Sequence, residues 1–124
     1  MIYLQTDYTF DSAHFLPDPY AGKCSRMHGH TYHLRVKWKV PQDLDEVGMA
    51  LDFGYIKRLI NEYLEQYDHH ILNDVMTATP TAEVMVKQIA EELTNYMSNL
   101  DLLIRPQVVT LWETESCAAV WERD

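Results

Sequence analysis

Residues 28–40, "HGHTYHLRVKWKV", indicate the fold most directly, because two kinds of side chain alternate along them. Even-numbered positions carry apolar residues or histidine, and odd-numbered positions from 31 onward carry polar or charged residues. A period of two is typical of a strand with one face in the core and the other in water. The sequence therefore predicts a half-buried strand over 28–40, with His28 and His30 on the inward face and His33 on the solvated face.

The segments on either side add one more strand, two helices and a strand pair. Residues 2–10 alternate in the same way and predict a first strand. Apolar residues at steps of three and four predict a helix over 52–67, with Asp52 capping its first turn. The same spacing predicts a second helix that starts around "TPTAE", residues 79–83. The run "VVTLWETESCAAVWE", 108–122, predicts two closing strands with a turn near residues 115 and 116.

This order of elements, ββααββ, predicts an α+β domain made of a four-stranded antiparallel sheet with two helices packed on one face. The sequence contains no internal repeat or linker, so we expect residues 1–124 to form a single domain. An open sheet leaves unpaired backbone groups at both edges, which proteins commonly cover by closure or by pairing with a partner. We therefore expect an oligomer.

Composition limits the class of partner and the compartment. Asp and Glu outnumber Lys and Arg by 19 to 10, a net charge of -9, which argues against nucleic acid as the ligand. No leader-like N-terminus and no membrane-spanning apolar run is present, so a cytoplasmic protein is expected. In that reducing compartment, Cys24 and Cys117 are expected to be thiols and not a disulfide.

Three histidines suggest a metal site. His28 and His30 lie two residues apart on a strand, a separation of about 6.6 Å along the chain that allows both rings to reach one ion. His14 continues the inward face of the first strand and supplies a third imidazole. Three nitrogen ligands with one open position match a catalytic zinc site. A closed structural site, with Cys24 as fourth ligand, is the main alternative.

Four other residues are candidates for chemistry. Cys24 stands between Lys23 and Arg26, whose charges favour its reactive thiolate. Asp68 precedes "HH" and can orient His69, and one of the two adjacent histidines must point elsewhere; the alternative is that these are ordinary polar residues at the end of a helix. Glu113 follows two inward apolar positions on its strand, where a carboxylate needs donor partners. A ligand edge with two adjacent N–H groups would supply them, and a strand end reaching solvent is the alternative.

Taken together, these motifs resemble the 6-pyruvoyl-tetrahydropterin synthase and 6-carboxy-tetrahydropterin synthase family. The resemblance covers nearly the whole chain and rests on "FDSAHFLP", "CSRMHGHTY", "LDFGYIK", "DHHILND", "PTAE" and "WETES". A cysteine followed after three residues by HGH, together with DHH and a late ET, is a specific combination. One departure is Tyr67, where many relatives carry Leu.

The resemblance implies a tunnelling fold (T-fold), in which sheets of several subunits close into a barrel and two barrels stack into a homohexamer with active sites at subunit interfaces. It implies Zn²⁺ as cofactor and assigns a role to each matching residue. The ligands would be His14, His28 and His30; the catalytic residues Cys24, Asp68, His69 and Glu113; and the pterin-binding residues Glu113, Thr81 and Glu83.

The expected activity is that of a lyase. The substrate would be 7,8-dihydroneopterin triphosphate, and the products 6-carboxy-5,6,7,8-tetrahydropterin, acetaldehyde and triphosphate, in the queuosine and 7-deazapurine pathway. The pyruvoyl-forming synthase of biopterin synthesis uses nearly the same residues and is the first alternative. A non-catalytic zinc-binding module is the second.

Overall fold

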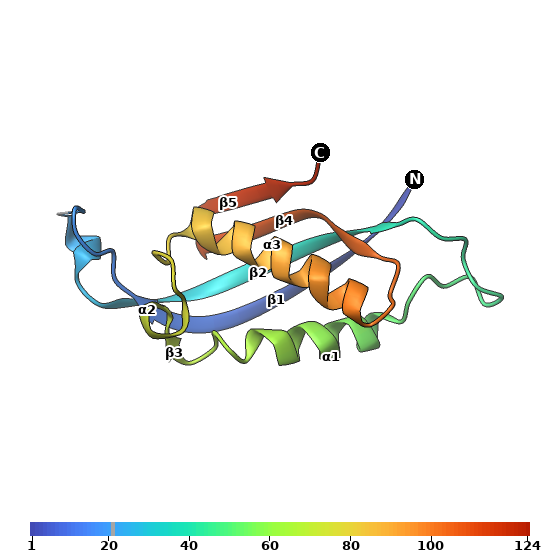
Figure 1. Cartoon of the computed structure of the whole chain (residues 1–124), viewed down its shortest axis with the longest axis horizontal. Coiled ribbons are helices and arrows are strands. Elements are labelled where there is room, and N and C mark those ends of the chain that lie inside the picture. Colours follow the sequence, from blue (N-terminus) through green and yellow to red (C-terminus); the bar gives the residue numbers. More distant parts are fainter. Residues whose placement is uncertain (21) are drawn as a thin grey trace.

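The computed structural model describes residues 1–20 and 22–124, and it contains the six predicted elements together with three short additions. Figure 1 shows the strands side by side with the helices laid against them. The six predicted elements are β1 (Ile2–His14), β2 (His28–Val40), α1 (Phe53–Leu64), α3 (Ala82–Asn99), β4 (Arg105–Thr114) and β5 (Cys117–Glu122). The additions are the 3₁₀ turn η1 (Lys23–Ser25), the strand β3 (His70–Ile71) and the helix α2 (Leu72–Val75).

The central pair of strands is β1 and β2, which run antiparallel from the Ile2–Val40 pair to the His14–His28 pair. The strand predicted over 28–40 is confirmed at both ends. The first strand is longer than the predicted 2–10, because its alternation of buried and accessible positions continues through Ser12 to His14. The C-terminal end of β1, with His14, and the N-terminal end of β2, with His28 and His30, therefore lie at the same end of the sheet.

Within the described part of the chain, the sheet has five strands in the order β3-β1-β2-β4-β5, one more than predicted. The four antiparallel strands are confirmed, and β4 and β5 meet at the predicted turn of residues 115 and 116. The extra strand, β3, pairs in parallel with Ser12 and Ala13 of β1. It holds only two residues, too few to show any periodicity in the sequence.

Two helices cover one face of this sheet, as predicted, with α1 beside β1 and α3 over β4 and β5 (Figure 1). The Asp52 carboxylate accepts a hydrogen bond from the Gly54 N–H and caps α1. The helix ends at Leu64, three residues earlier than predicted, because the Leu64 carbonyl accepts the N–H groups of Tyr67 and Asp68 in a tight turn. None of the described helices is long and apolar enough to cross a membrane.

Between the helices and the inward face of the sheet lies a continuous apolar core. Its largest fully buried side chains are Trp38, Tyr32, Tyr67, Leu34, Ile56, Ile60, Leu72, Met85, Ile89, Leu93, Met97 and Ile104. The inward face is apolar along most of its length and changes to histidine only at the end where His14, His28 and His30 lie. This end of the sheet carries the candidate site.

Candidate active site

Three imidazoles converge at this end of the sheet. His14 and His28 are direct cross-strand partners, and His30 projects on the same side of β2. The three ring centroids are 4.6 to 5.0 Å apart, with the planes steeply inclined to one another. One nitrogen from each ring lies within 4.8 Å of the other two. The convergence that the alternation predicted is therefore present.

Backbone carbonyls fix the tautomer of two of these rings. His14 Nδ1 lies 2.8 Å from the Pro80 carbonyl oxygen, and His28 Nδ1 lies 2.7 Å from the Arg26 carbonyl oxygen. Because a carbonyl only accepts, both Nδ1 atoms carry the hydrogen and a neutral ring keeps its lone pair on Nε2. A hydrogen bond from the second ring nitrogen to a carbonyl is the usual support of a metal-binding histidine.

The remaining nitrogens have the character of metal ligands. His14 Nε2 and His30 Nε2 are buried and have no hydrogen-bond partner among the described residues. Such orphaned polar atoms cost free energy unless a ligand meets them. Burial lowers the pKa of His30, and the nearby Glu113 carboxylate opposes that shift only in part. Its ring is therefore neutral at neutral pH, the form that binds metal.

Glu113 points inward from β4, as the alternation predicted. Its Oε1 atom lies 3.2 Å from His14 Nε2 and 3.5 Å from His30 Nε2, outside hydrogen-bonding geometry. A carboxylate that faces two nitrogen lone pairs is stabilised by a cation between them. Nitrogen ligands with a neighbouring carboxylate suit zinc, so these residues fit the zinc ion that the sequence suggests.

The two residues predicted from "PTAE" lie at the beginning of α3. Thr81 is the N-cap, where its hydroxyl oxygen accepts the Val84 N–H at 3.2 Å. Glu83 lines a cavity of about 200 Å³ together with Glu113. The structure thus brings the two glutamates to one cavity, while the position of Thr81 is explained by helix capping.

Cys24 lies in the turn η1, half-buried and unpaired, and Cys117 is also a free thiol. The backbone carbonyl of Cys24 accepts the Leu16 N–H at 2.8 Å, and this bond holds the turn against the end of β1. The cluster of mutually close ligand atoms contains the three imidazoles and not the Cys24 sulfur. This geometry favours a site with three protein ligands over the closed four-ligand alternative.

Asp68 and His69 form a second group. His69 Nδ1 lies 2.9 Å from Asp68 Oδ2, whereas the ring of His70 turns away and its Nδ1 bonds the Asp68 carbonyl at 2.8 Å. The Asp11 N–H and then His69 lower the pKa of Asp68, and the bond to Asp68 raises the pKa of His69. His69 has a backbone φ of +59°, a left-handed conformation that is uncommon outside glycine.

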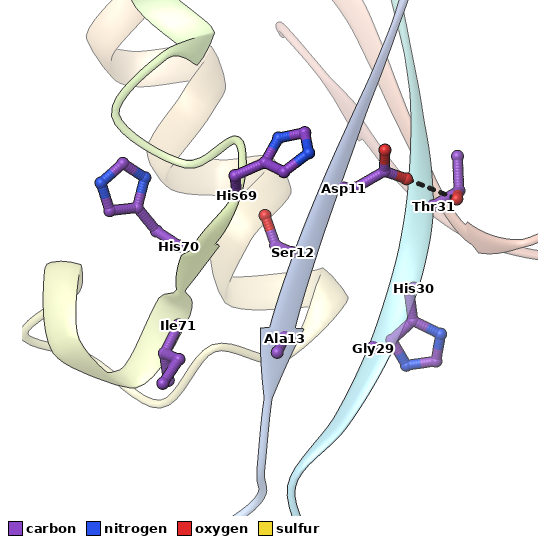
Figure 2. A pocket seen from close by; sticks show the side chains of 9 residues that line it. All are labelled: Asp11, Ser12, Ala13, Gly29, His30, Thr31, His69, His70 and Ile71. Atoms are coloured by element: carbon purple, nitrogen blue, oxygen red, sulfur yellow. Dashed lines mark hydrogen bonds between the residues drawn. The ribbon is translucent and has the colours of Figure 1, made fainter.

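Within one chain, the two groups remain separate. The Asp68 and His69 ligand atoms form a set with Asp11, distinct from the three imidazoles. His69 and His30 both line a cavity of about 480 Å³, together with the small residues Ala13 and Gly29 (Figure 2). The His69 side chain is 77% exposed, whereas His14 is 2% exposed.

Sequence reasoning did not find Asp11, which lies at an outward position of β1 and looks like any solvated strand residue. Asp11 lies opposite Thr31 on β2, and this register is not visible in the sequence. His33 is on the outward face, as predicted, but it is not merely solvated. It lies 3.1 Å from Asp7 Oδ2 and against the Trp112 ring.

Comparisons with known proteins agree on one family. The sequence model of the 6-pyruvoyl tetrahydropterin synthase family matches residues 3–124. The 6-carboxy-5,6,7,8-tetrahydropterin synthase of Bacillus subtilis is 34% identical over 79% of this chain and 69% of its own length. The protein of that name from Haemophilus influenzae is 29% identical over 92% of this chain and 94% of its own length.

A solved structure is similar to this chain in fold. The Caenorhabditis elegans 6-pyruvoyl tetrahydropterin synthase superimposes with a TM-score of 0.81, at 24% identity, over 99% of this chain and 96% of its own. At that identity the likeness concerns the fold alone, and it identifies the α+β arrangement as a T-fold. The predicted fold class is confirmed.

Proposed function

The chain belongs to the 6-pyruvoyl tetrahydropterin synthase family, and from that premise we propose that it is a zinc-dependent lyase acting on 7,8-dihydroneopterin triphosphate. The proposed products are 6-carboxy-5,6,7,8-tetrahydropterin, acetaldehyde and triphosphate. The observation that carries the proposal is the convergence of three imidazoles, two of which direct buried, unpartnered Nε2 atoms into the site. Relatives named for the carboxy product support this branch of the family.

The metal would be held by His14, His28 and His30. When bound, zinc acts as a Lewis acid that polarises a substrate oxygen and lowers the pKa of a hydroxyl group. The carbonyls of Pro80 and Arg26 keep two of the rings in the required tautomer.

The proposed work of the other residues is proton transfer and substrate binding. Cys24, as thiolate, removes a proton from the substrate side chain. Asp68 holds the His69 ring by its Nδ1 atom, which leaves Nε2 free to exchange a proton with the substrate. Glu113 accepts two N–H groups of the pterin edge, and Glu83 contributes to the same cavity.

We further propose a homohexamer in which neighbouring chains complete each site. In support, the exposed Asp68–His69 pair stands apart from the three imidazoles of its own chain. Among the described residues, the edge of β1 that faces away from β2 is unpaired before Ser12, and the outer edge of β5 is also unpaired, so both edges are available for pairing. A single domain over 1–124, a cytoplasmic location and a place in queuosine synthesis complete the proposal.

Product analysis tests the proposed reaction. The zinc-loaded protein is incubated with 7,8-dihydroneopterin triphosphate, and the products are separated and identified by mass. Carboxytetrahydropterin with acetaldehyde is the expected result. Pyruvoyltetrahydropterin would instead assign the biopterin branch, and the absence of turnover by a metal-loaded oligomer would contradict both enzymatic functions.

The variant Cys24→Ala separates the enzyme from the structural zinc module. We expect it to retain zinc at one ion per chain and to lose turnover by at least about 100-fold, because the proton acceptor is gone. Ser25→Ala is the matched control, since it shortens an exposed polar side chain of the same turn η1 and keeps the Cys24 thiol, and it should leave both zinc and turnover unchanged. Loss of zinc from Cys24→Ala would identify the sulfur as a ligand.

A further inference from the structure

Asp11 contacts the Asp68–His69 pair through all of its polar backbone groups. Its N–H donates to Asp68 Oδ1 at 2.9 Å, and its carbonyl accepts the His69 N–H at 2.6 Å. These two bonds begin the parallel pairing of β3 with β1 and hold His69 in its left-handed conformation. The backbone of one β1 residue thus fixes both members of the pair.

The side chain of Asp11 is also held in place. The Thr31 hydroxyl on β2 donates to Asp11 Oδ1 at 2.5 Å, the bond drawn in Figure 2. The figure shows the His69 ring turned toward β1, whereas the His70 ring points away from it. A carboxylate oxygen of Asp11 lies within 4.8 Å of both the Asp68 oxygen and the His69 nitrogen.

Two carboxylates at this separation repel each other unless a positive charge lies beside them. The ring that meets this requirement is His69, which forms an ion pair with Asp68. The other titratable rings on the surrounding elements are His70 on β3, which is bonded to the Asp68 carbonyl, and His30 on β2. Neither forms an ion pair with Asp11 or Asp68 among the described contacts.

We propose that Asp11, anchored by Thr31, is a positioning residue that holds His69 as an oriented imidazolium alongside Asp68. This inference rests on the proposed function, in which His69 exchanges a proton with the substrate. Asp11 itself does not contact the reacting atoms. Its carboxylate stabilises the charged form of the ring, so His69 keeps its proton to higher pH and delivers it in a fixed orientation. The positive shift in the His69 pKa has the direction that this arrangement requires, with Asp68 as its largest cause and Asp11 as a smaller one.

The test is a titration of the His69 ring by NMR in the intact, zinc-loaded protein, with Asp11→Asn as the variant. Asn is isosteric, keeps an oxygen for the Thr31 hydroxyl and leaves both backbone bonds in place. Loss of a charge within 4.8 Å is expected to lower the midpoint of the His69 titration by about half a pH unit. Thr31→Val frees the carboxylate and should give a smaller shift of the same sign.

Asp7→Asn is the matched control, because it removes one carboxylate from the same face of the same strand, where Asp7 pairs with Arg35 and His33. It should leave the His69 midpoint unchanged. An unchanged midpoint in Asp11→Asn, or an equal shift in Asp7→Asn, would overturn the assignment of Asp11. In the enzyme assay, the limb of the pH–kcat profile that reports His69 should move down by the same amount in Asp11→Asn.

The two proposals fail separately. The titration needs no substrate, so a wild-type protein that makes no product contradicts the proposed function whatever the NMR result. If the wild-type protein forms the expected products but the His69 titration midpoint is the same in Asp11→Asn, only the role of Asp11 is contradicted.

Discussion

The three-imidazole cluster and the Asp68–His69 pair differ in their backbone support and in their exposure to solvent. The cluster lies on two long paired strands, and its most buried member, His14, is 2% exposed. The pair lies on an irregular turn after α1, with the His69 side chain 77% exposed and its backbone in a left-handed conformation. A metal site needs rigid ligands shielded from water, whereas a proton-transfer group must be accessible to a substrate. The comparison predicts that damage to the cluster removes the metal, while damage to the pair removes activity alone.

The largest effect is expected from His14→Ala. This change removes one of three nitrogen ligands and leaves the Pro80 carbonyl without its donor. Zinc affinity should fall by more than the ~100-fold that loss of an outer hydrogen-bond partner costs. The purified variant is therefore expected to contain no stoichiometric zinc by elemental analysis and to show no turnover.

His33→Ala provides the matched control for that experiment. It removes an imidazole from the same pair of strands, but from the outward face, where the ring pairs with Asp7. Zinc content and turnover should both remain at wild-type values. A variant at His14 that keeps a full complement of zinc would show that the metal is bound elsewhere.

Most of this cluster could be predicted from the sequence, because strand alternation is regular. Parity alone separates the inward His28 and His30 from the outward His33, and the structure confirms both placements. The same alternation carries the face of β1 on to His14. The carbonyl of Pro80, which fixes the tautomer of His14, could not be predicted, because it depends on how the segment before α3 docks on the sheet.

An intermediate effect is expected from Asp68→Asn. The side chain keeps an oxygen for the Asp11 N–H, so the turn and β3 should persist, but the charge that holds the His69 proton is lost. We expect kcat to fall by about 100-fold, with zinc content unchanged and KM little altered. Steady-state kinetics and metal analysis on the same preparation measure both. Loss of zinc would show that the pair and the cluster are one structural unit, contrary to the comparison.

The arrangement around the pair was the less predictable half of the site. The adjacency of Asp68 and His69 is visible in "DHH", and the structure confirms that the carboxylate pairs with the first histidine. The contribution of Asp11 was invisible, because it is separated from Asp68 by 57 residues and depends on a two-residue parallel strand. Such contacts arise from tertiary docking, and local periodicity carries no information about them.

The smallest expected effect is on stability, and it follows from the sign of two pKa shifts. The pKa of Asp68 is lowered from 3.8. Its contribution to the free energy of unfolding is therefore present above pH 3.8 and is lost as the pH falls through the folded-state pKa. The pKa of His69 is raised from 6.5. Its contribution to the free energy of unfolding is therefore present below pH 6.5 and is lost as the pH rises through the folded-state pKa. Both contributions to the free energy of unfolding are therefore complete only between pH 3.8 and pH 6.5.

Thermal unfolding of the wild-type protein and of Asp68→Asn across pH measures this window. Because the pair is exposed, the two Tm values should differ by only about 1–3 °C, with the largest difference between pH 4 and 6.5. Above that range the difference should shrink without vanishing, since the charged Asp68 carboxylate accepts the Asp11 N–H more strongly than the neutral amide oxygen of Asn does. A difference that stays constant from pH 4 to 9 would mean that the His69 charge adds nothing to the folded state, and that backbone bonds alone hold the exposed pair.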